Sequence, residues 1–222
     1  MTDAFARRQN GTADPASVLP GSRILPVLTV PSATTAAPLA EALVAGGARC
    51  VEVTLRTPAA LEAVRTMAAH GGLCVGAGTV LTPEDAERAV EAGARFVLSP
   101  GYDAETVERC RLLGVPVMPG VATATEVQRA LRDGVSTVKL FPAESLGGPA
   151  VIAALAAPFP GMRFVPTGGI GPARLPEYLG HPAVAAVGGS WMASAALLES
   201  NDWAQVRRLT AEAVAIGERG VS

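Results

Sequence analysis

The sequence predicts a single-domain α/β protein, a (β/α)8 TIM barrel with a short N-terminal helical extension. Short apolar runs and longer helical segments alternate eight times along the chain, as in parallel strands that are each followed by a covering helix. The length of 222 residues suits one such domain. Hydrophobic residues make up 49% of the chain and aromatic residues only 4%, so small and branched side chains dominate the expected core.

The strands are predicted from short apolar runs that turn residues bound on both sides. They lie at residues 24–30, 50–55, 73–77, 96–99, 115–118, 137–141, 163–166 and 184–187. The helices are predicted from the spacing of Ala, Glu and Arg between these runs. They lie at residues 34–45, 58–69, 83–92, 104–113, 124–133, 148–156, 173–179 and 202–218.

Helix start and stop signals support these boundaries. Thr82 can cap the third helix, since Pro83 and acidic residues follow it in the first turn. Several helices end at a glycine, which accepts the left-handed closing conformation. Such glycines are Gly46, Gly93, Gly114, Gly134 and Gly180.

The domain organisation follows from the same pattern. Residues 1–22 are expected to form a tail with a short helical turn near residues 14–19, and residues 23–222 to form the barrel catalytic domain. The main alternative is a doubly wound open sheet. That fold needs fewer strands, and it usually carries a Gly-rich fingerprint after its first strand, where this chain has Val30, Pro31 and Ser32.

Composition and charge exclude several classes of partner. The net charge is −2 with no basic stripe, so no nucleic-acid partner is expected. No apolar stretch reaches the roughly 18 residues of a membrane span, and no signal peptide is recognised. Cys50, Cys74 and Cys110 lack CxxC spacing, which indicates free thiols and a cytoplasmic location. No cluster of side chains has metal-ligand spacing, so neither a metal nor a cofactor is expected.

Lys139 is the single lysine among 18 basic side chains, so it stands where an arginine cannot serve. Strand alternation points Thr137, Lys139 and Phe141 toward the barrel interior and Val138 toward the helices. Desolvation there disfavours the ammonium form, and a neutral amine is what attack on a carbonyl requires. The alternative is a lysine whose amine reaches solvent from the strand end.

The second strand carries three polar side chains on its inward face, Glu52, Thr54 and Arg56. Buried charged groups are costly unless they are paired or used in chemistry. These residues are therefore candidates for a catalytic or substrate-binding group. The alternative is a structural ion pair between Glu52 and Arg56.

Polar and glycine residues follow other strands at the end of the barrel where active sites lie. Thr167, Gly168 and Gly169 follow the seventh strand, and Ser190 follows a second Gly-Gly pair after the eighth. Loops at these two places commonly bind phosphate, because glycine lets backbone amides approach an anion. Thr79 and Pro100, after the third and fourth strands, are by themselves ordinary turn residues.

Taken together, six motifs give this chain a family resemblance. They are VEVTLRT (51–57), GAGTVL (76–81), SPG (99–101), KLFPAE (139–144), RFVPTGGI (163–170) and GGSW (188–191). In order and spacing, the chain resembles the 2-keto-3-deoxy-6-phosphogluconate (KDPG) aldolases, also called 4-hydroxy-2-oxoglutarate aldolases, from about residue 24 to the last helix. The polar N-terminal tail is not part of the resemblance.

The resemblance implies a class I aldolase, an aldehyde-lyase that cleaves 2-dehydro-3-deoxy-6-phosphogluconate to pyruvate and glyceraldehyde 3-phosphate in Entner–Doudoroff carbohydrate metabolism. It implies cleavage of 4-hydroxy-2-oxoglutarate to pyruvate and glyoxylate as a secondary reaction. It also implies a homotrimer that needs no metal or cofactor.

The resemblance also implies a role for each matching position. Lys139 corresponds to the Schiff-base lysine and Glu52 to the general acid/base. The remaining roles are Arg56 and Thr79 for the pyruvate carboxylate, Phe141 and Pro100 for the wall of the pyruvyl site, Thr167 for a substrate contact, and Gly168, Gly169 and Ser190 for the phosphate.

Other functions remain open at this point. A 2-dehydro-3-deoxy-6-phosphogalactonate aldolase would share the lysine strand and the phosphate loop, although its second strand differs from residues 54–57 here. A phosphosugar isomerase or epimerase on the same barrel would use Glu52 as a base but has no use for an inward Lys139. A non-catalytic protein that binds phosphorylated metabolites would keep only the glycine loops.

Overall fold

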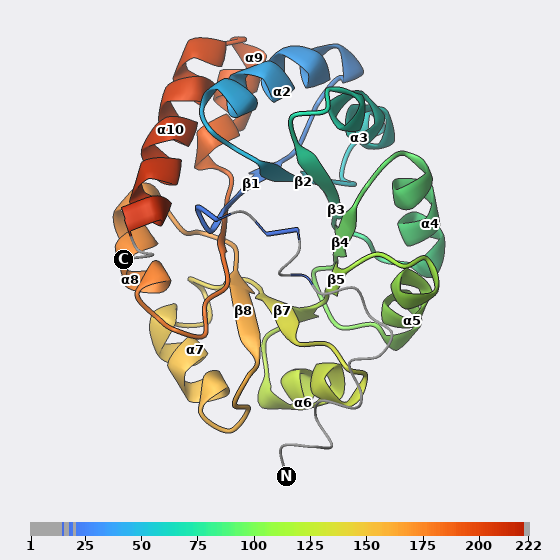
Figure 1. The fold of residues 1–222 in the computed structure, drawn as a ribbon, viewed down its shortest axis with the longest axis vertical. Helices are drawn as coiled ribbons and strands as arrows, with labels where there is room; N and C mark the ends of the chain where they lie inside the picture. Colours follow the sequence, from blue (N-terminus) through green and yellow to red (C-terminus); the bar gives the residue numbers. More distant parts are fainter. Residues whose placement is uncertain (1–14, 16–17, 20, 220–222) are drawn as a thin grey trace.

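A computed structural model describes residues 15, 18, 19 and 21–219 of the chain. It is an α/β fold in which parallel strands curl around a centre and helices surround them (Figure 1). The strands are β1 (Ile24–Leu28), β2 (Cys50–Thr54), β3 (Cys74–Gly78), β4 (Phe96–Leu98), β5 (Val117–Met118), β6 (Gly120–Val121), β7 (Thr137–Leu140), β8 (Arg163–Pro166) and β9 (Val187–Gly189).

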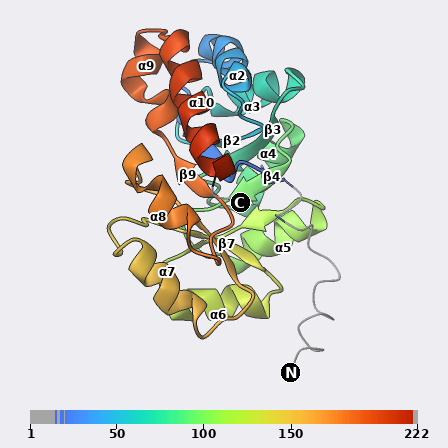
Figure 2. The same ribbon diagram turned by 60° about the vertical axis from the view of Figure 1, so that its left-hand side comes forward.

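The helices that cover the strands alternate with them along the chain, as predicted. They are α2 (Ala36–Ala45), α3 (Ala60–Ala69), α4 (Pro83–Glu91), α5 (Ala104–Leu112), α6 (Ala124–Arg132), α7 (Pro149–Ala156), α8 (Leu175–Leu179), α9 (Ala195–Glu199) and α10 (Trp203–Arg219). Short 3-10 turns η2 (Ala33–Thr35), η3 (Pro172–Arg174) and η4 (Trp191–Ala193) precede α2, α8 and α9. Figure 2 shows the side of the molecule that α8, α9 and α10 cover.

The strands form two parallel sheets, ordered β5-β4-β3-β2-β1-β9 and β6-β7-β8. Only Pro119 separates β5, which pairs with β4, from β6, which pairs with β7. On the other side, single bridges join Phe164 to Val184 and Thr167 to Gly188. The sequence therefore predicted the curled parallel α/β sheet correctly.

Two predicted strands differ in detail. The fifth, predicted at 115–118, lies at Val117–Met118 and is followed by β6 at Gly120–Val121; Pro119 separates the two, because proline has no N–H to donate to a ladder. The eighth was predicted at 184–187 but lies at Val187–Gly189, where it pairs with the start of β1. The prediction stopped early because glycine has a low strand propensity. The short helix α9 was not predicted at all.

The hydrophobic residues form two cores. One lies between the sheet and the helices and contains the outward residues of the strands, such as Val51, Val53, Val138 and Leu140. The other lies inside the curled sheet. It contains Leu25, Cys50, Phe96, Leu98, Met118, Val165 and Ala186. This inner core forms a floor beneath the more polar interior.

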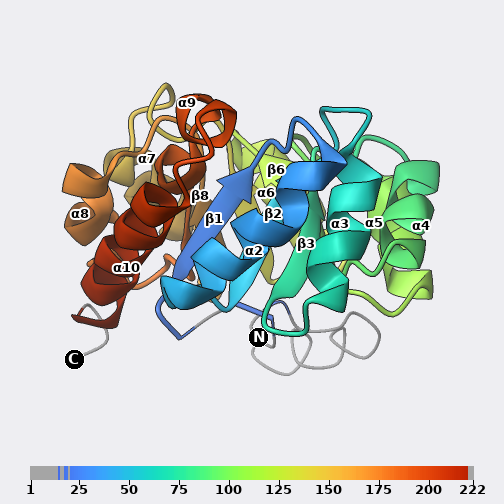
Figure 3. The same cartoon turned by 90° about the horizontal axis from the view of Figure 1, so that it is seen from above.

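The described part of the N-terminal tail touches this floor. Val18 and Leu19 pack against the inner core, and their amides donate hydrogen bonds of 3.2 Å to the Pro15 carbonyl. These bonds agree with the predicted turn near residues 14–19, of which residues 14, 16 and 17 lie outside the described part. Figure 3 shows α9 at the upper end of the molecule and α2, α3 and α10 along the near side. Within the described residues, no helix combines the length and apolarity needed to cross a bilayer.

Candidate active site

Above the apolar floor, the interior contains a buried ion pair. Glu52 on β2 and Lys139 on β7 point inward, and Lys139 Nζ donates to Glu52 Oε1 at 2.8 Å. Glu52 has no exposed surface and Lys139 is 4% exposed. Because strand side chains alternate, Val51, Val53, Val138 and Leu140 face the helices while these two charged groups meet inside. The predicted inward direction of both residues is confirmed.

Gly78 on the neighbouring strand β3 makes room for the carboxylate. A Cβ atom at residue 78 would lie 2.0 Å from Glu52 Oε1, so any larger side chain would displace it. Among the described residues, Glu52 Oε2 is buried and has no hydrogen-bond partner. One carboxylate oxygen is thus paired with the amine, and the other can accept a hydrogen bond from a bound molecule.

Lys139 lies between small and apolar neighbours. It is in register with Gly120 on β6 and Val165 on β8, and its amine lies 5.6 Å from the centroid of the Phe141 ring. This low-polarity surrounding strengthens the interaction between Lys139 and Glu52. The alternative that the amine extends into bulk solvent is wrong for this structure.

Arg56 and Thr79 form a second polar pair near the strand ends. Arg56 follows the end of β2, and its Nε donates to Thr79 Oγ1 at 3.1 Å. The alternative of a Glu52–Arg56 ion pair is wrong, since Lys139 is the residue that pairs with Glu52. Thr79 has φ of 55°, a strained conformation for a β-branched residue. Strained residues of this kind cluster at active sites and ligand-binding segments.

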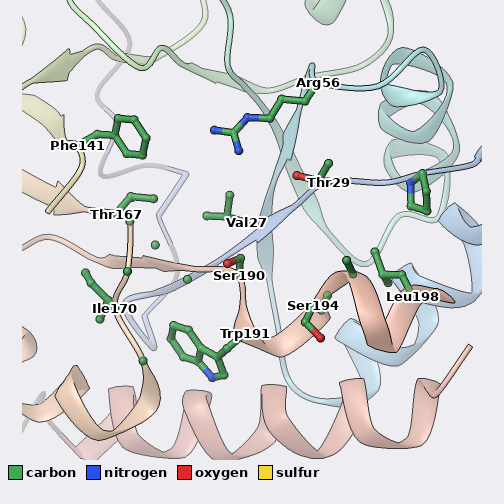
Figure 4. Close-up of a pocket in the computed structure, with 18 of the residues that line it drawn as sticks. Val27, Thr29, Arg56, Phe141, Thr167, Ile170, Ser190, Trp191, Ser194 and Leu198 are labelled. Carbon is green, nitrogen blue, oxygen red and sulfur yellow. The ribbon is translucent and has the colours of Figure 1, made fainter. Parts of the chain in front are cut away.

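A cavity of about 690 Å³ opens above this interior. Figure 4 shows its residues, with the Arg56 guanidinium extending between Phe141 and Thr29. Thr167 and Ile170 lie on one side, and Ser194 and Leu198 of the α9 segment lie on the other. The cavity therefore joins the lysine to loops that follow several strands.

Glycine loops form one wall of the cavity. Gly168 and Gly169 have φ of 105° and 81°, a backbone conformation that other residues rarely adopt. The Phe141 ring lies 3.3 Å from the position of a Cβ on Gly168, so the loop is also closely packed. Gly188, which pairs with Thr167 in a single bridge, leaves space for the Thr167 hydroxyl, since a Cβ on Gly188 would lie 2.3 Å from it. Exposed Ser190 follows directly after β9.

The predicted site residues thus occupy one region. Those that line the cavity are Arg56, Lys139, Phe141, Thr167, Gly168, Gly169 and Ser190. Glu52 lies against Lys139, and Thr79 holds Arg56. Pro100 does not line this cavity; its carbonyl lies 2.1 Å from the position of a Cβ on Gly120.

Sequence reasoning missed other residues that line the cavity. Val27, Thr29 and Pro31 come from the first strand and the segment after it, and Ser194 and Leu198 come from the region of α9. Alternation along the first strand could have placed Val27 and Thr29 inside. The α9 residues lack such a signal, since their segment is shorter than a typical helix. In the described part of the chain, no group of three or more His, Cys, Asp or Glu side chains is arranged to hold a metal ion.

Comparisons with known proteins give a consistent result. A family model described as "Aldolase: KDPG and KHG aldolase" matches residues 16–209. The chain is 49% identical to a 2-dehydro-3-deoxy-phosphogluconate aldolase of Treponema pallidum (strain Nichols) over 195 residues, which cover 87% of this chain and 93% of that protein.

Two solved structures are also similar to the chain. The 2-keto-3-deoxy-6-phosphogluconate aldolase of Zymomonas mobilis ZM4, solved with 3-phosphoglycerate, has a TM-score of 0.86 at 42% identity, covering 90% of this chain and 94% of that chain. A KDPG aldolase from Legionella pneumophila has a TM-score of 0.86 at 38% identity, covering 90% and 97% respectively. That structure contains pyruvate captured at low pH as a covalent carbinolamine intermediate.

Proposed function

Because the chain belongs to the KDPG and KHG aldolase family, we propose that it uses Lys139 to cleave 2-dehydro-3-deoxy-6-phosphogluconate into pyruvate and glyceraldehyde 3-phosphate. It is a carbon–carbon lyase of the class I, Schiff-base type. The observation that carries the proposal is the buried contact of 2.8 Å between Lys139 Nζ and Glu52 Oε1 at the base of the cavity. A nucleophilic amine and an acid/base group are the two parts that this reaction requires.

The reaction begins with proton transfer and attack. The Glu52 carboxylate accepts a proton from the Lys139 ammonium, which leaves a neutral amine. The amine adds to the C2 carbonyl of the 2-oxo acid and forms a carbinolamine. Protonated Glu52 then gives its proton to the carbinolamine hydroxyl, which leaves as water. This step restores the Glu52 carboxylate and forms an iminium, whose positive nitrogen can accept an electron pair.

Bond cleavage follows. Glu52 removes the proton of the C4 hydroxyl, and the C3–C4 bond breaks as its electron pair moves toward the iminium. Glyceraldehyde 3-phosphate leaves, and an enamine of pyruvate remains on Lys139. Glu52 then returns a proton to C3, and water hydrolyses the new iminium to release pyruvate. One carboxyl serves both steps because its protonation state alternates.

The other residues of the cavity support one orientation of the substrate, with its carboxylate at one end and its phosphate at the other. Arg56 can bind the substrate carboxylate through its planar guanidinium, and Thr79 fixes that guanidinium. Phe141 is proposed to form the wall of the pyruvyl site, and Thr167 to contact the substrate; the same role for Pro100 is not proposed, because Pro100 does not line the cavity. Gly168, Gly169 and Ser190 are proposed to bind the phosphate at the far end of the carbon chain.

The proposal includes a fully closed (β/α)8 TIM barrel, in which the two sheets form one ring. The single residue between β5 and β6 and the bridges at Phe164 and Thr167 support it. We also propose a homotrimer located in the cytoplasm, without nucleic-acid partners. Sedimentation equilibrium tests the assembly: a particle with three times the chain mass of 22.5 kDa is expected, and a monomer would contradict it.

A trapping experiment tests the chemistry. Pyruvate with borohydride should add a pyruvyl-derived mass to the peptide that contains Lys139, because reduction fixes the iminium. The Lys139→Arg variant should show no added mass and no turnover, since Arg stays protonated. Circular dichroism of that variant serves as the control for folding. Label on another residue would overturn the role of Lys139.

A second experiment tests the substrate. Pyruvate release is followed with lactate dehydrogenase on 2-dehydro-3-deoxy-6-phosphogluconate, its 6-phosphogalactonate counterpart and 4-hydroxy-2-oxoglutarate. The gluconate substrate should have the highest kcat/KM, and 4-hydroxy-2-oxoglutarate should be a slower substrate because it lacks the phosphate. A higher kcat/KM on the galactonate counterpart would replace the proposed substrate.

A further inference from the structure

Glu144 lies directly beside the Gly168–Gly169 turn, although no step of the proposed reaction uses it. We propose that Glu144 is a positioning residue that holds this turn in place, and that Arg174 neutralises its carboxylate so that the turn can accept a phosphate. This inference rests on the proposed function, since it concerns the phosphorylated end of the substrate. It adds a residue and a charge balance to that site.

Backbone contacts join the Glu144 segment to the turn. The Glu144 amide donates to the Gly168 carbonyl at 3.1 Å, and the Ala143 amide donates to the Thr167 carbonyl at 2.9 Å. The Glu144 Cβ lies 2.9 Å from the position that a Cβ on Gly169 would occupy. A displacement of Glu144 would therefore move both glycines of the turn.

Side chains of η3 and α8 hold the Glu144 carboxylate. Tyr178 on α8 donates from its hydroxyl to Glu144 Oε1 at 2.5 Å, and Arg174 Nη1 lies 3.1 Å from Glu144 Oε2. Tyr178 is fully buried, and burial, together with its bond to Glu144, raises its pKa well above the ordinary value. Tyr178 is therefore protonated near neutral pH and can donate to Glu144.

The charges of this network have a consequence for an anionic ligand. A free carboxylate so close to the turn would repel a phosphate. The Arg174 guanidinium pairs with Glu144 and also with Glu177, and it lies 5.8 Å from the Tyr178 ring centroid. The loss of Arg174 alone would leave a negative charge beside the turn, whereas the loss of both charges would not.

The test uses a charge series in the full-length protein. The variants are Arg174→Gln, Glu144→Gln, the double variant, and Glu177→Gln as a matched control that removes the other acidic partner of Arg174. The readout is the ratio of kcat/KM on 2-dehydro-3-deoxy-6-phosphogluconate to kcat/KM on unphosphorylated 4-hydroxy-2-oxoglutarate. Low ionic strength is used, because the Debye length is only about 10 Å at 0.1 M salt.

If Arg174 neutralises Glu144, the kcat/KM ratios of the variants should follow a definite pattern. Arg174→Gln should lower the ratio about tenfold, mainly through KM for the phosphorylated substrate, as expected for a like charge near a bound anion. The double variant should restore the ratio to within about threefold of the original protein, while Glu177→Gln should leave it within about twofold.

Other outcomes separate this inference from the proposed function. If the original protein cleaves neither substrate, the proposed function fails. If it cleaves both and every variant lowers both values equally, Glu144 and Arg174 only stabilise the fold, and the inference is overturned. A double variant that stays as impaired as Arg174→Gln would also overturn it. Thermal unfolding of each variant identifies those that lose activity by unfolding.

Discussion

At the scale of single residues, the buried Lys139–Glu52 ion pair is not expected to stabilise the fold more than apolar residues would. Removing two charges from water costs several kcal/mol for each ion, and apolar residues of similar volume would pack there at least as well. Glu52 Oε2 has no hydrogen-bond partner among the described residues, which adds to that cost. Such a pair agrees with the proposed role of both residues in catalysis.

Replacing Glu52 by glutamine tests its role in proton transfer. Glu52→Gln keeps the shape of the side chain but cannot take up or return a proton. Exchange of the pyruvate methyl protons with deuterium, followed by NMR, should slow by about two to four orders of magnitude. Borohydride trapping of pyruvate on the same variant shows whether the iminium still forms. An unchanged exchange rate would remove Glu52 from the mechanism.

At the scale of elements, the strands place side chains and their neighbours make the space. β2 points Glu52 inward, while β3 provides Gly78 at the point where the carboxylate needs room.

Side-chain caps define where helices start. In α6, the Thr123 side chain accepts from the Glu126 amide, and the Glu126 side chain accepts from the Thr123 amide, a capping box that defines the start of the helix.

A methyl group at residue 78 should disturb both stability and activity. Gly78→Ala places a Cβ 2.0 Å from Glu52 Oε1, so the carboxylate must move away from Lys139. We expect a loss of about 1–3 kcal/mol in the free energy of unfolding, as is usual for overpacking, together with reduced turnover. Gly101→Ala is the matched control, because nothing lies within 4 Å of its Cβ position. Equal behaviour of the two variants in urea unfolding would refute this account.

The capping box also predicts that the stability contributed by Glu126 depends on pH. Burial alone would raise the pKa of Glu126, but hydrogen bonds from Ala122 and Thr123 lower it below the ordinary value of 4.5. The unfolded chain then takes up the proton more readily, so the stabilisation is present above about pH 5 and is lost as the pH falls through the lowered pKa. Glu126→Gln should therefore be less stable than the original protein at pH 7, and the difference should shrink toward pH 3.

Chemical denaturation at both pH values checks this effect. The exposed Glu218 on α10 offers a control, since Glu218→Gln should change stability by no more than about 0.5 kcal/mol. A difference for Glu126→Gln that stays constant from pH 7 to pH 3 would show that the carboxylate does not contribute through its ionisation.

At the scale of the whole molecule, the two hydrophobic cores have different roles. The outer core between the sheet and the helices contains most of the apolar residues and stabilises the architecture. The inner core closes one end of the curled sheet and leaves the other end open to the cavity. The polar site thus lies on an apolar floor, and its residues come from segments spread along the chain.

The cysteines report on the integrity of these cores. Cys50 lies in the inner core and Cys110 in the outer core, and both are buried. Burial raises the pKa of Cys50 well above its usual value and that of Cys110 to about 12, so neither is a thiolate near neutral pH. Cys74 is only half-buried, and its pKa is raised by burial to a lesser degree.

Thiol labelling at pH 8 should therefore proceed in two phases. A chromogenic disulfide reagent should react first with Cys74, and with Cys50 and Cys110 only as the chain unfolds. In denaturant all three thiols should react together. The Cys74→Ser variant should lose the first phase alone. Three equally rapid thiols in the folded protein would mean that the two cores open independently of global unfolding.

Much of this protein could be predicted from local patterns. Alternation along residues 50–55 and 137–141 placed Glu52 and Lys139 inside, and the occurrence of a single lysine in the chain pointed to Lys139 as the proposed nucleophile. Helix signals such as Thr82 followed by Pro83 placed helix starts within a residue or two. These features depend on neighbours in sequence, through strand pleating and helix capping, so the sequence contains them directly.

Other features depend on residues that are distant in sequence. The partner of Glu52 is Lys139 and not the nearby Arg56, and Gly78 is required because a carboxylate from another strand fills its space. Likewise, α9 contributes to the cavity, and Glu144 meets Tyr178 and Arg174 beside the glycine turn. The sequence by itself determined which residue types face inward. Only the tertiary structure decided which of them meet, because the curvature of the sheet sets the distances between side chains on different strands.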